Sequence, residues 1–261
     1  MERYLRTGVP DPVIGDWASP PEFGSQGDLI APSHIDLKGE ALLSARAAYY
    51  GAINHVDDQM RRLLNGITLG GLGLNDNTIV VFTSDHGEML GDHYRWRKSV
   101  PYEASARVPF MIRAPKEFGI ESTSTVNAIA THTDIMPTLL DLAGIAIPDH
   151  LDGKSLMPLI RGEKTQCREY LHIEHAPEHQ TLTDGIEKYI WLPACGSEQF
   201  FDLTTDPNEC HNLASDPQHA DRVTFWRERM IKELANRPEG FSDGRSLIAG
   251  RPYGAVILGR S

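Results

Sequence analysis

One short segment constrains this chain more than any other. The run Thr78–Lys98 reads TIVVFTSDHGEMLGDHYRWRK. Its first six residues, Thr78–Thr83, are apolar or β-branched and predict a buried strand, which ends abruptly in the polar residues SDHG. In open α/β sheets, ligands bind at the carboxyl ends of the strands. The segment therefore predicts an α/β fold in which Asp85 and His86 stand at the end of a strand, with Lys98 in a loop that folds back over them.

The neighbouring segments predict the layers around this strand. Apolar residues recur at three- and four-residue steps over residues 36–65, which is typical of a helix. A second strand is predicted at Arg107–Arg113 and a second helix at Thr131–Ala143. Because continuous apolar strands are typical of parallel sheets covered on both faces, we expect a mixed, mostly parallel sheet between helices.

The pattern changes after residue 148. Short strand-like runs are separated by turn residues, and an amphipathic helix with Val223, Trp226, Met230 and Leu234 on one face follows them. We therefore expect two domains: residues 1–148, and residues 149–261 with a small antiparallel sheet capped by a helix. The predicted elements are strands at Tyr170–Glu174, Glu187–Leu192 and Gln199–Leu203 and a helix from Asp216 to about Asn236.

The charge balance excludes one class of partner. The chain has 261 residues with 36 acidic and 25 basic side chains, a net charge of -11, and no run of Lys and Arg. A nucleic-acid partner is therefore not expected, and an anionic substrate has to be held by local cations. No apolar run has the length of a membrane span, and the first residues lack the apolar core of a secretory signal. We expect a soluble protein of the cytoplasm or periplasm.

Asp85 and His86 are the candidate metal ligands. Carboxylate oxygen suits a hard cation such as Ca²⁺, and the imidazole widens the choice to Mn²⁺ or Zn²⁺. The alternative is an ordinary strand end, where the aspartate caps a turn and the histidine is solvated. The histidines at 172, 175 and 179 have the alternating spacing of a strand, and we interpret them as surface imidazoles rather than metal ligands.

The loop after the strand supplies candidates for binding an anionic ester. Lys98 could hold an oxygen of a sulfuryl or phosphoryl group, and His93 could contact the substrate or serve the leaving group. Arg95 could line the mouth of the site, and His132, at a helix cap, could face it. The alternatives are a surface lysine, a solvated loop and a histidine that only bonds the helix end.

Taken in order, these segments resemble the sulfatases, which belong to the alkaline-phosphatase-like superfamily. The matching segments extend over most of residues 40–215. They are Thr78–Gly87, Leu90–His93, Lys98, Tyr102–Pro109, His132–Asp141, Asp152–Leu156, Phe201–Glu209 and Asn212–Leu213. The Asp-His pair is similar to the branch that contains choline sulfatases and phosphonate monoester hydrolases.

The resemblance implies a metal-dependent sulfuric ester hydrolase similar to arylsulfatases. It implies a divalent metal, usually calcium, at Asp85 and His86, a sulfate contact at Lys98, and protonation of the leaving oxygen by His93 or by a histidine outside this chain. The nucleophile of the family is a formylglycine made from a C-x-P-x-R or S-x-P-x-R segment. The family fold is a mixed sheet between helices followed by a four-stranded C-terminal subdomain, and the implied substrate is a sulfate ester of a small molecule or carbohydrate.

The sequence departs from the family at the nucleophile. None of its cysteines, Cys167, Cys195 and Cys210, begins a C-x-P-x-R segment, and no serine stands in the equivalent context. The chain therefore resembles the C-terminal half to two-thirds of a sulfatase. We expect no sulfatase turnover from this chain alone, because a nucleophile cannot be replaced by positioning.

Two other functions stay open at this point. The Asp-His pair also permits a hydrolase of phosphonate monoesters or phosphodiesters. Alternatively, the chain is a non-catalytic remnant that associates with a second copy or with a missing N-terminal part, because missing strands leave sheet edges and apolar surface exposed. Sugar, aryl and choline sulfates all remain possible substrates.

Overall fold

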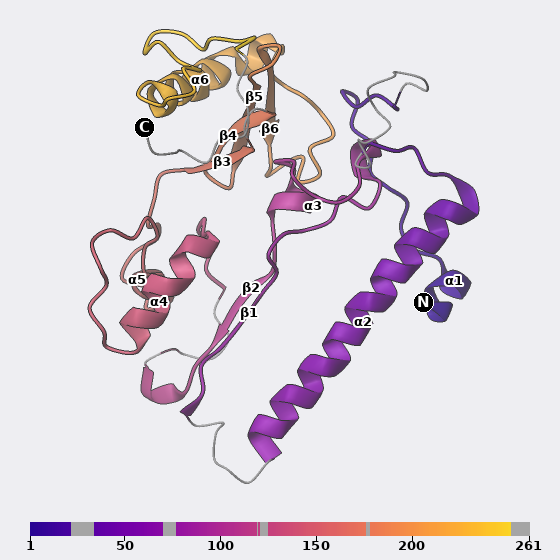
Figure 1. The fold of residues 1–261 in the computed structure, drawn as a ribbon, viewed down its shortest axis with the longest axis vertical. Helices are drawn as coiled ribbons and strands as arrows, with labels where there is room; N and C mark the ends of the chain where they lie inside the picture. The colour runs from indigo at the N-terminus through magenta and orange to yellow at the C-terminus, as the bar shows by residue number, and fades with distance from the viewer. Residues whose placement is uncertain (22–33, 70–76, 119, 121–124, 176–177, 252–261) are drawn as a thin grey trace. The chain divides into compact units, whose positions relative to one another are not determined.

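The computed structural model describes residues 1–21, 34–69, 77–118, 120, 125–175 and 178–251 (Figure 1). Their contacts form two compact units. The first contains Met1–Val13, Ser19–Arg97 and Val108–Cys167, and the second contains Ile14–Ala18, Lys98–Arg107 and Arg168–Ser261. The domain boundary expected at residue 148 stays a prediction.

Two helices of the first unit pack together near the N-terminus. They are α1 (Glu2–Thr7) and α2 (Gly39–Leu69). The ring centroids of Tyr4 and Tyr50 lie 5.4 Å apart, and the Tyr4 hydroxyl donates to Asn54 Oδ1 at 2.6 Å. The predicted helix is confirmed, but it continues through Gly66. A glycine inside a helix costs about 1 kcal/mol relative to alanine, which does not by itself end a helix of 31 residues.

The predicted strand pair is present, but its strands run in opposite directions. The two strands, β1 (Val80–Thr83) and β2 (Phe110–Arg113), are antiparallel, with Val80 opposite Arg113 and Thr83 opposite Phe110. All four β1 residues are half-buried. The expected mostly parallel sheet is therefore absent from the described residues, whose sheets are both antiparallel. The strand itself is confirmed, but its residues are half-buried and not buried as predicted, and composition does not specify the direction of the strand alongside.

A short 3-10 turn and a helix follow in the same unit, as predicted. They are η4 (His132–Asp134) and α4 (Ile135–Leu142). Thr131 and Asp134 form a reciprocal capping box, and the other Asp134 oxygen accepts from Lys154 N at 2.8 Å. A Cβ on Gly153 would lie 1.8 Å from the carbonyl oxygen of Thr133, so only glycine fits there. Further helical pieces among the described residues of this unit are η2 (Asp92–Tyr94), η3 (Lys116–Phe118) and α5 (Met157–Ile160).

The second unit is built on an antiparallel sheet, as the sequence predicted, and this sheet has four strands, the number that the family resemblance implies. Its order is β3-β4-β5-β6. The strands are β3 (Leu171–His175), β4 (His179–Thr183), β5 (Glu187–Leu192) and β6 (Ser197–Asp202). Strand β4 escaped prediction because its sequence HQTLT is mostly polar, yet all five of its residues are buried.

Both faces of this sheet are covered. On one face lies α6 (Ala220–Leu234), preceded by η5 (Pro217–His219) (Figure 1). The core between them contains Leu182, Tyr189, Trp191, Phe200, Val223, Trp226, Met230, Leu234 and Phe241. Side chains alternate along a strand, so Lys188 and Ile190 point away from α6. That second face is covered by residues 98–107, which include α3 (Glu103–Ala106), and by Trp17, whose ring stacks on Tyr102 at 4.8 Å.

Candidate metal and anion site

The centre of the candidate site is the residue pair that follows β1. The strand ends at Thr83, and the backbone of the next residues is held by local hydrogen bonds. The Ser84 hydroxyl donates to the carbonyl of His86 at 2.7 Å, and the backbone N–H of His86 donates to Asp85 Oδ1 at 3.0 Å. Asp85 is exposed and His86 is half-buried, so both side chains are held at the strand end within reach of solvent.

A nitrogen of His86 and an oxygen of Asp85, each with a lone pair, face each other. His86 Nδ1 lies 2.7 Å from the carbonyl oxygen of Gly87, so in the neutral ring Nδ1 carries the proton and donates it. The unprotonated Nε2 then lies 3.4 Å from Asp85 Oδ2. Two ligands about 2.4 Å from one cation, at a right angle to each other, lie about 3.4 Å apart. The pair therefore fits two adjacent positions in the coordination shell of one divalent cation.

The pair supplies only part of such a shell. Among the residues that the structure describes, no group of three or more His, Cys, Asp and Glu side chains is arranged to hold a metal ion. Calcium takes six to eight oxygen ligands, so the remaining ligands have to come from substrate, water or further protein groups.

His132 lies at the same strand end. It is the first residue of η4, and its Nε2 is 2.8 Å from the carbonyl oxygen of Ser84, the residue directly before Asp85. The imidazole is exposed. The structure thus brings Asp85, His86 and His132 together, and His132 connects the start of α4 to the end of β1.

His93 is buried within η2, not solvated. Its side chain is only 3% exposed, and its backbone has a positive φ of 53°. The backbone N–H of His93 donates to the Val13 carbonyl at 2.8 Å, and the backbone N–H of Val13 donates to Asp92 Oδ1 at 3.0 Å. Burial raises the pKa of Asp92. Arg46 of α2 lies 3.6 Å from the same carboxylate, so this loop is fixed to the helix.

The placement of Arg95 beside Asp85 and His86 stays a prediction, whereas the charge of Asp85 acts on Tyr49. The buried Nε atom of Arg95 has no hydrogen-bond partner in the described part of the chain. This donor is therefore available to bind an anion. Tyr49 of α2 escaped the sequence interpretation. Burial, Glu88 and Asp85 together raise the pKa of its hydroxyl. The spacing of Tyr49 within the predicted helix indicated only an apolar face. No feature of the sequence indicated that its hydroxyl lies near Asp85 and Glu88.

Lys98 is exposed and belongs to the second unit, whereas Asp85 and His86 belong to the first. The convergence of these three groups stays a prediction. None of the described helices is long and apolar enough to cross a bilayer.

Comparison with known proteins gives two overlapping family matches. The sulfatase family model matches residues 11–145, and the model for the C-terminal part of N-sulphoglucosamine sulphohydrolase matches residues 91–236. An arylsulfatase from Clostridium perfringens is 41% identical over 98% of this chain, and a choline-sulfatase from Rhizobium meliloti is 37% identical over 76%. The chain spans 54% and 39% of the lengths of these two relatives.

Solved structures show the same likeness. A protein in complex with its substrate D-glucosamine-2-N,6-O-disulfate is 31% identical, with a TM-score of 0.64 over 78% of this chain and 44% of that one. A phosphonate monoester hydrolase from Silicibacter pomeroyi is 26% identical, with a TM-score of 0.69 over 90% of this chain and 52% of that one.

Proposed function

This chain belongs to the sulfatase family, and we propose that it supplies the metal-binding and anion-binding residues of a sulfuric ester hydrolase. The observation that carries the proposal is the 41% identity to an arylsulfatase over 98% of the chain. The 3.4 Å approach of Asp85 Oδ2 and His86 Nε2 supports it from the site itself. The substrate class is a sulfate ester of a small molecule or a carbohydrate, in line with the disulfated glucosamine bound by one related structure.

Asp85 and His86 are the proposed metal ligands, with calcium as the expected ion. A divalent cation at this position neutralises negative charge on a sulfate group. The hydrogen bond from His86 Nδ1 to Gly87 fixes the ring so that Nε2 is available as a ligand. His132 holds the backbone of Ser84 and thereby the orientation of the neighbouring carboxylate.

The proposed substrate contacts are cationic or proton-donating. Lys98 binds a sulfate oxygen, and Arg95 and His132 are further contacts. His93 is the proposed donor of a proton to the leaving oxygen, a role that a fixed imidazole can fill. Its burial and its backbone bond to Val13 support a fixed position.

No residue of this chain is suited to become formylglycine, because none of its three cysteines begins a C-x-P-x-R segment. The test of the proposal therefore has two parts. The purified 261-residue chain should not hydrolyse 4-nitrophenyl sulfate. A chimera that joins it to the portion of the Clostridium perfringens arylsulfatase outside the match should hydrolyse it, and should lose activity with Lys98→Ala.

Calcium binding to the chain itself is the direct measurement. Two protein ligands predict roughly millimolar affinity by calorimetry, and Asp85→Ala should abolish the signal. Asp149→Ala, which removes an exposed carboxylate elsewhere in the first unit, is the matched control and should leave the titration unchanged. Equal calcium binding by the Asp85→Ala variant would refute the assignment of the metal ligands.

A second candidate activity is hydrolysis of phosphonate monoesters. It is favoured by the similarity to the Silicibacter pomeroyi phosphonate monoester hydrolase, which extends over 90% of this chain. Parallel assays of the chimera on 4-nitrophenyl sulfate and 4-nitrophenyl phenylphosphonate separate the two. A higher kcat/KM for the phosphonate ester would make this the better assignment.

A further inference from the structure

The second unit contains a fully buried lysine that the proposed chemistry does not use. Lys188 of β5 is 0% exposed, although a buried charge is costly unless it is completely paired. Its position on β5 directs it away from α6 and toward residues 98–107. Those residues continue directly from Lys98.

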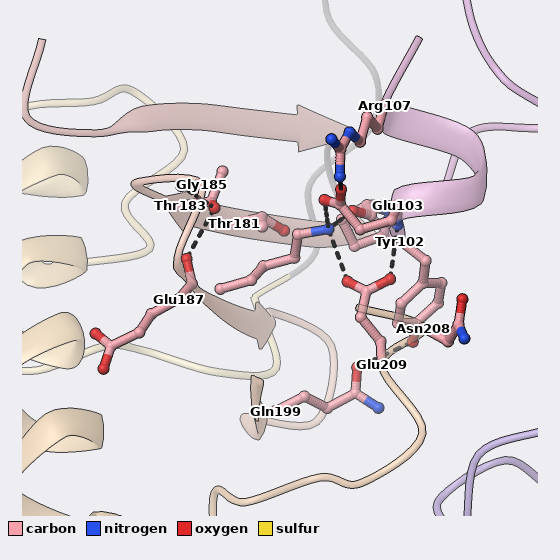
Figure 2. Close-up of polar contacts among 12 residues, drawn as sticks. Tyr102, Glu103, Arg107, Thr181, Thr183, Gly185, Glu187, Gln199, Asn208 and Glu209 are labelled. Atoms are coloured by element: carbon pink, nitrogen blue, oxygen red, sulfur yellow. Dashed lines mark hydrogen bonds and ion pairs between the residues drawn. The ribbon is translucent and has the colours of Figure 1, made fainter. Parts of the chain in front are cut away.

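The three protons of this ammonium group have three acceptors. Lys188 Nζ donates to the Pro101 carbonyl at 2.8 Å, to Glu209 Oε1 at 2.7 Å and to Glu103 Oε1 at 2.8 Å. An ammonium has three donors and no acceptor, so its hydrogen-bonding capacity is filled. Two of the acceptors belong to the segment that follows Lys98. Figure 2 shows the carboxylates of Glu103 and Glu209 pointing toward one another around this contact.

Glu209 holds the same segment by a second bond. Its Oε2 accepts from the backbone N–H of Glu103 at 2.6 Å (Figure 2). Its carbonyl accepts from Trp17 Nε1 at 2.7 Å. Glu209 is 1% exposed and has a positive φ of 56°, a conformation that costs a non-glycine residue about 1 kcal/mol. The hydrogen bonds of its carboxylate and its carbonyl therefore offset the cost of this backbone conformation.

The backbone next to Lys98 is also held from β4. Buried His179 forms a hydrogen bond with the backbone of Ser99, which has a positive φ of 73°. Side chains of two adjacent strands therefore fix positions one and three residues beyond Lys98. Three residues span at most about 10 Å, so the anchors restrict where the Lys98 side chain begins.

We propose that Lys188, together with Glu209, is a positioning residue for Lys98, so that the four-stranded sheet sets the location of the anion-binding lysine. The inference rests on the proposed function for the role of Lys98 in binding sulfate, but the anchoring itself does not. A stabilising role alone would need only a packed hydrocarbon side chain, since replacing buried ion pairs by apolar residues is often neutral or stabilising. The cluster instead gives three directed bonds to a segment that the proposed chemistry depends on.

The anchoring is tested by hydrogen–deuterium exchange on the 261-residue chain. Lys188→Met should accelerate exchange of the peptide that covers residues 98–107, while peptides from α6 keep their protection. Lys232→Met removes an exposed lysine from α6 and is the matched control, which should change neither. If Lys188→Met unfolds the unit, Glu103→Ala removes one anchor and leaves the Lys188–Glu209 pair. Unchanged exchange of residues 98–107 in a folded variant would overturn the proposal.

The functional consequence is tested by calorimetric titration with inorganic sulfate. Lys188→Met should weaken binding roughly tenfold, the effect of losing one hydrogen bond to a charged group. In the Lys98→Ala background the same substitution should have no further effect. An equal loss in both backgrounds would mean that Lys188 acts by its charge and not through Lys98. If Lys98→Ala leaves sulfate binding unchanged, the proposed role of Lys98 fails, whereas the exchange experiment still decides whether the segment is anchored.

Discussion

At the scale of single residues, buried titratable groups govern how the second unit responds to pH. His179 is 4% exposed and lies beside His175, with ring centroids 6.2 Å apart. Burial, followed by repulsion from His175, lowers the pKa of His179 to about 4, although its bond to Ser99 opposes the shift. Glu209 behaves in the opposite way, because burial raises its carboxyl pKa despite the neighbouring Lys188.

His179 therefore predicts acid sensitivity. Below its ordinary pKa of about 6.5 the unfolded chain binds a proton that the folded chain does not bind until about pH 4. The stability contributed by neutral His179 is thus present above pH 6.5 and is lost as the pH falls to 4, by about 3 kcal/mol in all. Urea unfolding, followed by tryptophan fluorescence at pH 7 and pH 4.5, measures this loss.

The controls separate His179 from other groups that titrate. His179→Gln should flatten the pH dependence of the unfolding free energy, whereas His55→Gln, an exposed residue of α2, should leave it as in the wild type. The same pH slope in the His179→Gln chain would contradict the assignment.

Sequence predicted the residues at the end of β1 better than it predicted buried polar ones. Asp85 and His86 follow an apolar run, so their place at a strand end could be read directly. His179 was interpreted as a surface imidazole, and Lys188 passed unnoticed in a strand that was otherwise predicted correctly. Burial of a polar side chain depends on partners such as Glu209 and Pro101, which are remote in sequence, and no local pattern encodes them.

At the scale of elements, the start of α4 depends on one buried carboxylate. Asp134 is 0% exposed, and its oxygens accept from Thr131 N at 2.9 Å and from Lys154 N at 2.8 Å. Asp134→Ala should lower the free energy of unfolding by about 3 kcal/mol, because it leaves two backbone donors without acceptors. Urea unfolding monitored by circular dichroism measures this change.

Asp149→Ala is again the matched control, since it removes an exposed carboxylate and should stay within about 0.5 kcal/mol of the wild type. If Asp134→Ala were equally mild, the capping box would not be the device that fixes this helix. The same substitution should also loosen His132, which begins η4 and contacts Ser84.

Elements with strong local signals were predictable. Thr131 and Asp134 form the expected kind of helix start, and Gly144 has the positive φ of 69° typical of a residue just beyond a helix end. Strand direction was not predictable, because β1 and β2 pair antiparallel through a register that no residue of β1 specifies alone. The extension of α2 past Gly66 shows that a single glycine, at about 1 kcal/mol relative to alanine, does not end a long helix.

At the scale of the whole molecule, helix α2 exposes a row of apolar side chains. Tyr49, Ile53, Val56 and Leu63 repeat at the spacing of one face of α2 and are 38–57% exposed. We call these four residues the α2 stripe. A stripe of this kind is ordinarily buried against another element. The chain also spans only 54% of the length of the arylsulfatase that it matches.

The α2 stripe predicts self-association of the 261-residue chain. Light scattering after size exclusion should show an apparent mass that increases with concentration, because a second copy can cover the stripe. Ile53→Glu combined with Val56→Glu should shift the chain toward the monomer, while His55→Glu, on the same helix but outside the stripe, should not. A wild-type chain that stays a monodisperse monomer at every concentration would contradict this prediction.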